Sequence, residues 1–292
     1  MKKDIEKRGE ILLEALPYIK KFWNKIVVIK YGGSAMQDKM LEGKIIEDII
    51  LLKYVGMKPV IIHGGGAEIS QEMEKRNIVP RFINGLRVTD EETMEITEMV
   101  LIGKINTRLV AEINLHILEG MGNGVKGIGL SGEDAQLLTV IKHSSLDLGF
   151  VGEIEKVNPE ILFVLLEKNY IPVIATVGVD KEGTRYNINA DAVAGQIGIS
   201  LQAEKLIYLS DVDGIFKDFE DQTSLISSLT INQAKDLIKS GQVQKGMIPK
   251  VDSAIQALEG GVNKVHFLNG KRAHCILLEL FTDSGIGTEI IP

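Results

Sequence analysis

The chain has 292 residues, enough for two domains or for one large α/β domain with a well-buried core. Lys and Arg number 33 against 40 Asp and Glu, and the formal net charge of -7 excludes the overall basic surface of a nucleic-acid-binding protein. Cys275 is the only cysteine, which excludes an intrachain disulfide and a thiolate zinc cluster. No segment resembles a signal peptide or a membrane span, so we expect a cytoplasmic protein.

The first third of the chain alternates helices with strands. Hydrophobic periodicity predicts an amphipathic helix over residues 4–23 and a short buried strand over 26–30 that ends in a glycine turn. A helix around 45–52 and a strand at 59–63 repeat this order, and the glycines at 64–66 open another helix. Because strands and helices alternate, the sequence predicts a parallel sheet with right-handed crossovers.

The rest of the chain continues the pattern after a glycine-rich middle. An Asn-Gly pair within 81–89 is typical of a β-hairpin, and two helices are expected between 91 and 119. The later elements expected are strands at 171–176, 205–209, 264–268 and 288–291 and helices at 190–199, 232–239 and 249–259. Together they predict one continuous α/β sheet with two lobes and a cleft at the carboxyl ends of its strands.

Two glycine turns follow strands of this predicted sheet. Gly32 and Gly33 end the first strand, and Gly64, Gly65 and Gly66 end the second. Without Cβ atoms, main-chain N–H groups can point at a bound anion, and the N-termini of the following helices add partial positive charge. Simple turn geometry also explains either turn alone, but the pair at neighbouring strand ends predicts an anion cradle.

A few charged residues occupy unusual positions. Lys30 is the last residue of an otherwise apolar strand, where its ammonium group needs an anionic partner unless it reaches solvent. Lys250 lies in the first turn of a predicted helix, where a cation opposes the helix dipole unless an anion compensates. Asp191 follows the good N-cap Asn189, and on the residues alone this structural role is favoured over catalysis. His63 fits either a position in the core or a role in the reaction. The residues alone predict only an anion-binding α/β enzyme.

Six motifs resemble the amino acid kinase family, and within it the enzymes that phosphorylate N-acetyl-L-glutamate. In chain order they are VIKYGG (28–33), HGGG (63–66), NGLRVT (84–89), NINAD (187–191), SDVDG (210–214) and GMIPK (246–250). The first and fifth are shared across the family, whereas the third and fourth point to N-acetyl-L-glutamate. The resemblance implies a three-layer αβα sandwich with a mainly parallel central sheet, preceded by an N-terminal amphipathic helix. It also implies phosphorylation of the substrate's side-chain carboxylate by ATP with Mg²⁺, the second step of arginine biosynthesis.

The resemblance also implies roles for individual residues. Lys30 and Lys250 would stabilise the transferring phosphoryl group, Asp191 would orient both lysines, and N–H groups of Gly33 and Gly65 would bind phosphoryl oxygens. The implied substrate residues are Gly65, Gly66, Arg87 and Asn187, and the implied nucleotide residues are Lys30, Gly32, Gly33, Ser210, Asp211, Gln244, Gly246 and Met247. Magnesium would be carried mainly by the nucleotide phosphates, so no protein metal ligand is expected. A carboxylate is already ionised at neutral pH, so the reaction needs no catalytic base.

Two further segments, the first helix and residues 274–288, resemble the arginine-inhibited branch of the family. The resemblance implies feedback inhibition by L-arginine bound near Tyr18, Lys217, His274, Glu279 and Gly287. It implies a hexamer, a trimer of dimers joined by the N-terminal helices, and it raises a PII-type signalling protein as a partner. The chain would divide into a regulatory helix (1–25), an acetylglutamate-binding and dimerising lobe (26–178) and a lobe for ATP and arginine (179–292). On amphipathicity alone, the helix could instead pack on its own domain.

Two alternatives stay open at this point. One is a kinase of the same fold that acts on another carboxylate, such as aspartate or glutamate. The other is a non-catalytic arginine-sensing or scaffold protein. Every catalytic position implied by the resemblance is filled in this sequence, which favours a working enzyme.

Overall fold

The computed structural model describes residues 13–36, 38–116, 125–144, 146–218, 220–243, 246–283 and 285–292. The N-terminal helix predicted over 4–23 is present at 13–22, and residues 4–12 lie outside the described ranges. Leu13 and Leu16 on this helix are 68% and 55% exposed, whereas Phe22 at its end is buried in the main core. Within the described ranges, no helix is long and apolar enough to cross a membrane.

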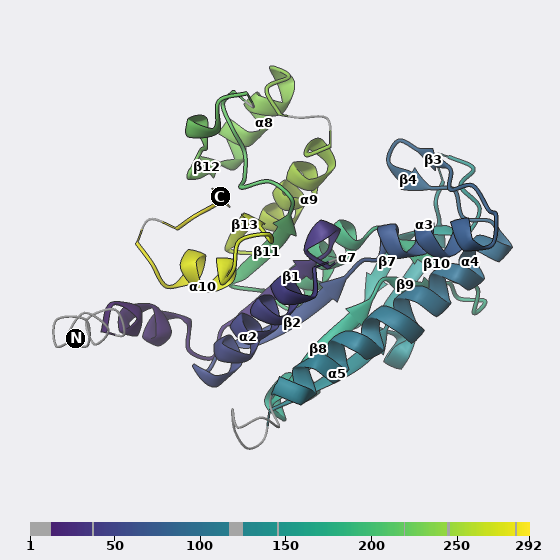
Figure 1. Ribbon diagram of the computed structural model, residues 1–292, viewed down its shortest axis with the longest axis horizontal. Helices are drawn as coiled ribbons and strands as arrows, with labels where there is room; N and C mark the ends of the chain where they lie inside the picture. Colours follow the sequence, from purple (N-terminus) through teal and green to yellow (C-terminus); the bar gives the residue numbers. More distant parts are fainter. Residues whose placement is uncertain are drawn as a thin grey trace.

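Eight strands form the central sheet in the order β12-β14-β13-β11-β1-β2-β8-β5 (Figure 1). Their bounds are β1 Ile26–Tyr31, β2 Lys58–His63, β5 Lys126–Ser131, β8 Tyr170–Ala175, β11 Lys205–Ser210, β12 Ser228–Thr230, β13 Lys264–Asn269 and β14 Thr288–Ile291. Every neighbouring pair is parallel except β13 with β14. The mainly parallel sheet is therefore confirmed, and β1 lies near its middle.

Helices cover both faces of the sheet and give the three layers of the fold. On one face lie α2 (Lys39–Tyr54), α3 (Gly66–Lys75), α5 (Thr107–His116) and α10 (Cys275–Leu280); on the other lie α6 (Glu160–Glu167), α7 (Ala190–Ser200), α8 (Ile231–Lys239) and α9 (Ile248–Glu259) (Figure 1). Each layer of helices buries its own apolar core against the sheet. Helices α6 and α10 were not expected from the sequence, because eight and six residues show little periodicity.

Strand β1 shows how the two cores divide the side chains. Val27, Ile29 and Tyr31 point into one core, while Val28 points into the other. Side chains alternate along a strand, so Lys30 shares the face of Val28, toward α7 and α9. The alternation therefore places the Lys30 side chain, at the carboxyl end of the strand, beside the N-termini of these helices.

The structure divides the β-structure more than the sequence predicted. β6 (Leu138–Lys142), β7 (Val151–Val157), β9 (Val177–Val179) and β10 (Arg185–Ile188) form a separate closed unit instead of joining one continuous sheet. The predicted hairpin is confirmed as β3 (Phe82–Ile83) and β4 (Leu86–Arg87). Its turn residues Asn84 and Gly85 have φ of 51° and 81°, the left-handed conformation that a two-residue hairpin turn requires.

The two helices expected over residues 91–119 are present within the described residues, but a π-helical segment joins them without a break. The described part is one continuous helical run, α4 (Glu91–Glu98), the π-helical segment η2 (Met99–Asn106) and α5. The wider π turns keep Val100, Leu101 and Ile105 buried together with Asn106. The Asn106 amide then donates to the Val173 carbonyl at 2.9 Å, which ties this long helix to β8.

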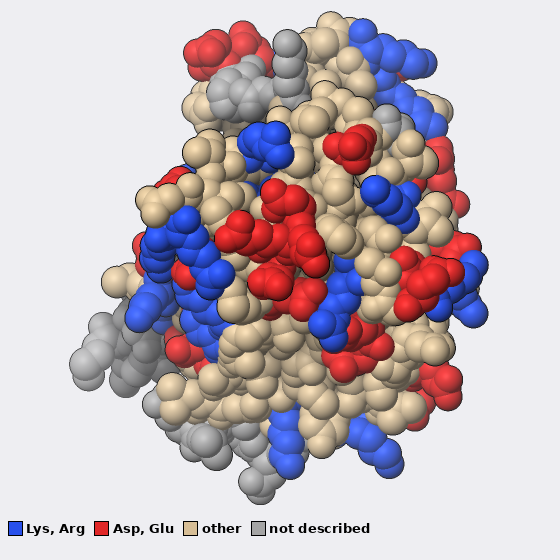
Figure 2. Space-filling model, turned by 90° about the vertical axis from the view of Figure 1, so that its right-hand side faces the viewer, with Lys and Arg blue, Asp and Glu red and all other residues tan. Residues whose placement is uncertain are grey.

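The face that carries the hairpin and α4 bears acidic and basic side chains side by side, with acidic ones gathered near its centre (Figure 2). This face therefore shows no broad basic field, in keeping with the formal net charge of -7.

His63, left between a core and a working role by the sequence, is a core residue. It is fully buried at the end of β2, where Asn106 Nδ2 lies 3.1 Å from its Nε2 and the Gly64 carbonyl lies 3.0 Å from its Nδ1. These partners suit a neutral ring with the proton on Nδ1. Burial lowers the pKa of His63 to about 4.

This burial predicts an acid-dependent loss of stability. Since the pKa of His63 falls from 6.5 to about 4 on folding, the unfolded chain binds the extra proton first as the pH drops. As the pH falls from 6.5 to 4, His63 should therefore lower the free energy of unfolding by about 3 kcal/mol. The free energy of unfolding, measured by urea denaturation at several pH values in this range, should fall less steeply with decreasing pH for His63→Gln than for wild type. Equal slopes would contradict the prediction.

Candidate active site

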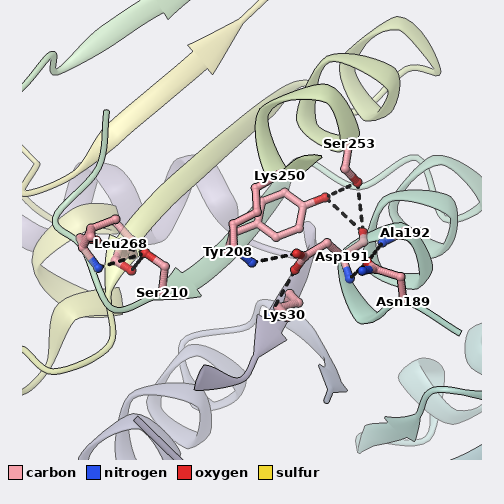
Figure 3. A network of polar contacts seen from close by, with 10 residues as sticks. Lys30, Asn189, Asp191, Ala192, Tyr208, Ser210, Lys250, Ser253 and Leu268 are labelled. Atoms are coloured by element: carbon pink, nitrogen blue, oxygen red, sulfur yellow. Dashed lines mark hydrogen bonds and ion pairs between the residues drawn. The ribbon is translucent and has the colours of Figure 1, made fainter. Parts of the chain in front are cut away.

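Three charged side chains from three elements meet at the carboxyl edge of the sheet. Lys30 lies at the carboxyl end of β1, while Asp191 and Lys250 lie in the first turns of α7 and α9. Asp191 Oδ1 lies 3.1 Å from Lys30 Nζ, and Lys250 Nζ donates to Asp191 Oδ2 at 2.6 Å (Figure 3). We call these three residues the charge triad. In it, one carboxylate is shared by two ammonium groups.

The charge triad is largely closed to solvent, with Lys30 8% and Asp191 9% exposed. Burial alone would raise the pKa of Asp191, but the charges of Lys30 and Lys250 outweigh it and hold that pKa below its usual value. Burial lowers the pKa of Lys30, the Asp191 charge opposes this effect, and the Lys250 charge adds to it. With both lysines protonated, one positive charge is left without a partner inside the triad, which suits an anionic ligand.

Local sequence explains the position of Asp191. Asn189 Oδ1 accepts hydrogen bonds from the N–H groups of Asp191 at 2.9 Å and Ala192 at 3.1 Å, which confirms the predicted N-cap. The cap fixes the first turn of α7 at the end of β1. Lys250 opposes the dipole of α9 as predicted, and Asp191 supplies the compensating anion. Capping and pairing with lysines are therefore both properties of this turn.

The two glycine turns lie side by side, because β1 and β2 are hydrogen-bonded neighbours. Gly33 has φ +77°, a conformation that favours glycine. Gly65 is the N-cap of α3, and a Cβ there would collide with apolar side chains of η2. A Cβ on Gly32 would lie 3.0 Å from Lys30 Nζ. The glycines thus let the main chain approach the charge triad closely.

A cavity of about 310 Å³ opens beside the charge triad. Of the residues predicted for catalysis and substrate binding, those that line it are Lys30, Gly33, Gly65, Gly66, Arg87, Asn187 and Asp191. Gly32, a predicted nucleotide residue, lines it too, whereas Lys250 contacts it only through Asp191. Its volume is that of a site for a small metabolite, in the range of roughly 300–1,000 Å³.

Arg87 presents a buried guanidinium at the hairpin side of this cavity. Its Nη2 donates to the Gly66 carbonyl at 2.7 Å and to Ser70 Oγ at 2.8 Å. Its guanidinium carbon lies 4.7 Å from the centre of the Phe82 ring, a cation–π contact. Within the described ranges no carboxylate pairs with it, and burial lowers its pKa. The guanidinium is held in place while its charge remains available to an anion.

Asn187 lines the same cavity from another element. It lies on β10, which is antiparallel to β9 and parallel to β7. Its Nδ2 lies 3.5 Å from Thr89 Oγ1, at the long limit of a hydrogen bond, so most of the amide's bonding capacity stays open to the cavity. The cavity therefore offers a cation and an amide in addition to the charge triad.

The remaining predicted nucleotide residues come from the segments after β11 and before α9. Ser210 Oγ donates to the Val212 carbonyl at 3.0 Å and fixes the turn after β11. The same turn brings Asp211 beside Gly33, since a Cβ there would lie 3.0 Å from Asp211 Oδ1. Met247 lines a small apolar pocket with Phe216 and Val243. Gly246 lies just before α9, whereas Gln244 lies outside the described residues.

Three of the residues predicted to lie near arginine gather at the C-terminal segment. The Tyr18 hydroxyl on the N-terminal helix donates to the Asp283 carboxylate. Glu279 on α10 is buried, and its Oε2 accepts from the N–H groups of Ile286 at 2.8 Å and Gly287 at 3.1 Å. The first helix therefore contacts the chain at Asp283, shortly after α10.

The other two predicted arginine residues, His274 and Lys217, contact other partners. His274, at the start of α10, contacts Asp48 Oδ1 of α2 at 2.6 Å through Nδ1. Lys217 is exposed in the loop after β11, where its N–H donates to Ser224. Sequence reasoning instead missed His266, whose Nδ1 lies 2.6 Å from Glu279 Oε1. A histidine inside the apolar strand β13 was the available signal.

Comparisons with known proteins agree with this geometry. The chain matches the amino acid kinase family over residues 25–269. An acetylglutamate kinase from Halothermothrix orenii is 51% identical over 288 residues, which cover 97% of each chain.

Solved structures of N-acetylglutamate synthase from Neisseria gonorrhoeae share the fold. The complex with coenzyme A and N-acetyl-glutamate has a TM-score of 0.84 at 28% identity and covers 97% of this chain and 63% of the synthase. The complex with coenzyme A and L-arginine has a TM-score of 0.82 at 27% identity and covers 97% and 65%. This chain thus spans less than two thirds of the synthase length.

The family match covers most of the chain, and the H. orenii relative matches at half of all positions from one end to the other. Both findings extend over the glycine turns and the charge triad. The chain belongs to the amino acid kinase family and, within it, to the acetylglutamate kinases.

Proposed function

We propose that this protein transfers the terminal phosphoryl group of ATP to the side-chain carboxylate of N-acetyl-L-glutamate, as a step of arginine biosynthesis. The observation that carries the proposal is the charge triad, with its excess positive charge, beside two glycine turns and a cavity for a small anion. The relatives named acetylglutamate kinase support the choice of substrate.

The chemistry asks for alignment and charge neutralisation more than for proton transfer. An acetylglutamate carboxylate is ionised at neutral pH and can attack without a base. Negative charge on the phosphoryl oxygens then needs fixed cations and N–H donors. Lys30 and Lys250 supply the cations, Gly33 and Gly65 supply the donors, and Asp191 keeps the two lysines from repelling each other.

The two substrates would enter from opposite sides of the charge triad. Arg87, with Asn187 and the N–H of Gly66, would hold the carboxylates of acetylglutamate, since a guanidinium can form two parallel bonds to one carboxylate. Ser210, Asp211, Gly246 and Met247 would hold the nucleotide beside Gly32 and Gly33.

The protein charges expected near the phosphates are mainly positive. Magnesium therefore fits this site only if the nucleotide itself carries the ion. Bound in that way, it would neutralise phosphate charge. The division into residues 26–178 for acetylglutamate and 179–292 for ATP is part of this proposal.

The first prediction concerns Lys30. Lys30→Met removes one cation from the charge triad and keeps the apolar stem, so kcat should fall by about 10²-fold or more. The measurement is trapping of the acyl phosphate as a hydroxamate with ATP and acetylglutamate. Lys142→Met, an exposed lysine at the end of β6, is the matched control. A variant of Lys30 with unchanged kcat would remove this residue from the proposed role.

The second prediction separates substrate classes. Arg87→Lys keeps the charge but loses the guanidinium's pair of parallel N–H donors. KM for acetylglutamate should therefore rise about tenfold or more, while KM for ATP changes little. Arg76→Lys, on the exposed end of α3, controls for the chemical change. A wild-type enzyme that prefers free aspartate or glutamate would support a kinase for another carboxylate.

We further propose feedback inhibition by L-arginine and a hexamer joined by the N-terminal helices. Glu279 is a buried carboxylate that forms no direct ion pair with a lysine or arginine within the described ranges; its Oε1 contacts His266, whose other ring nitrogen contacts Lys205, and a guanidinium would compete with this histidine for the carboxylate. The L-arginine complex of the similar synthase structure supports this reading. The exposed Leu13 and Leu16 support a further partner for the helix face.

The third prediction tests the arginine site. Glu279→Gln keeps acceptors for Ile286 and Gly287 but removes the charge, so the arginine concentration for half inhibition should rise about tenfold or more. Rates are normalised to each variant without arginine, and Glu182→Gln serves as an exposed control. Unchanged inhibition in Glu279→Gln would place the site elsewhere. Arginine binding by a wild type without turnover would instead support a sensor or scaffold.

A further inference from the structure

The main-chain carbonyl of Asp191 is held by two side-chain hydroxyls. The hydroxyl of Tyr208 lies 3.2 Å from this oxygen, and Ser253 Oγ lies 3.0 Å from it (Figure 3). The two hydroxyls lie 3.0 Å from each other. A closed triangle of polar atoms therefore surrounds the backbone of the residue whose carboxylate joins the two lysines.

The two hydroxyls come from the elements that flank α7. Tyr208 lies on β11, is fully buried, and stacks on Phe267 with ring centres 5.3 Å apart. Ser253 lies on α9, three residues after Lys250, so both side chains leave the same side of that helix. The contacts thus tie α7 to the strand beside β1 and to the helix that carries Lys250.

Gly195 leaves the space that the two hydroxyls occupy. It lies four residues after Asp191 on α7, and a Cβ there would lie 3.2 Å from Ser253 Oγ and 3.7 Å from the Tyr208 hydroxyl. A Cβ would press on Ser253 Oγ and lie in ordinary contact with the Tyr208 hydroxyl. The close approach of α7 and α9 at this point therefore depends on a glycine as well as on the hydroxyls.

Two hydroxyls carry two protons, but the triangle has three contacts. Both hydroxyls can donate to the carbonyl, or one of the two can donate to the other hydroxyl, which then donates to the carbonyl. Loss of one hydroxyl leaves the other able to donate to Asp191 directly. The arrangement is therefore redundant, and only the loss of both leaves the carbonyl without a side-chain donor.

We propose that Tyr208 and Ser253 form a positioning clamp on the Asp191 carbonyl that fixes the distance between the Asp191 carboxylate and Lys250. The proposal rests on the proposed phosphoryl transfer, and the two residues act through Asp191 without touching a substrate. The contact between Lys250 Nζ and Asp191 Oδ2 spans two helices at 2.6 Å, so a small shift of α9 would open it. Ser253, on the same side of α9, opposes that shift.

The test uses Tyr208→Phe, Ser253→Ala and the double variant in the full-length protein. Because the clamp is redundant, each single change should lower kcat by only about two- to fivefold, and the double change should lower it by about 30-fold or more. KM for ATP and for acetylglutamate should stay within about twofold, since neither substrate touches the clamp. An effect of the double variant no greater than the product of the single effects would contradict the redundancy.

Two control variants separate positioning from general loss of stability. Ser200→Ala removes another serine bond to a backbone carbonyl on α7, that of Gln196 at 2.9 Å. Ile197→Val shortens a fully buried side chain on the same helix. Thermal unfolding places all variants on one scale. A control as unstable as the double variant but with normal kcat supports the clamp, whereas an equal loss of kcat in both overturns it.

A second measurement does not depend on the substrate. Competitive acetylation with acetic anhydride, followed by mass spectrometry, gives the reactivity of Lys250 relative to the exposed Lys142. The double variant should raise this ratio several-fold, because the Lys250 side chain, once released from its contact with Asp191, is more accessible to the reagent. If wild type fails to phosphorylate acetylglutamate, the proposed function fails, and the acetylation ratio still decides the clamp. An unchanged ratio would overturn it.

Discussion

The contact on which the rest of the structure depends is one buried carboxylate between two ammonium groups. A buried charge without a partner is strongly destabilising, and here each lysine depends on Asp191. The carboxylate in turn is held by both lysines, by the Asn189 cap and by two hydroxyls on its own carbonyl. The fold thus concentrates positive charge at one cleft of a chain whose overall charge is negative.

The layered fold makes this contact available. Alternation along β1 sends Val28 into the core shared with α7 and α9, so the next residue on that face, Lys30, meets the first turns of both helices. The parallel register of β1 and β2 brings both glycine turns to the same edge. Helix termini, glycine turns and the lysine therefore meet where parallel strands end, which is the usual place for a ligand in such sheets.

Much of this could be predicted from the sequence, and the parts that could are local. The Asn189 cap, the glycine turns, the hairpin and most strands follow from a few neighbouring residues. The position of Lys30 followed from one apolar strand. The contacts of Tyr208, Ser253 and His266 join segments far apart in the chain, and no local pattern marks their partners.

The features that were not predicted have the same physical origin. The π-helical segment η2 joins the two expected helices, and its contact with β8 comes from a distant part of the chain that no local pattern marks. The closed unit of β6, β7, β9 and β10 depends on which strand edges meet, and periodicity cannot show this. His274, predicted to lie near arginine, has Asp48 of α2 as a partner, and no local pattern marks this contact.

The junction between the N-terminal helix and β1 has an optical consequence. Trp23 is the only tryptophan of the chain, and it is 63% exposed at the end of that helix. Its ring packs on Gly56, where any side chain would collide with it. Intrinsic fluorescence excited in the indole band therefore comes from a single site at the C-terminal end of the helix. Movement of the helix relative to the sheet can be followed in the unlabelled protein.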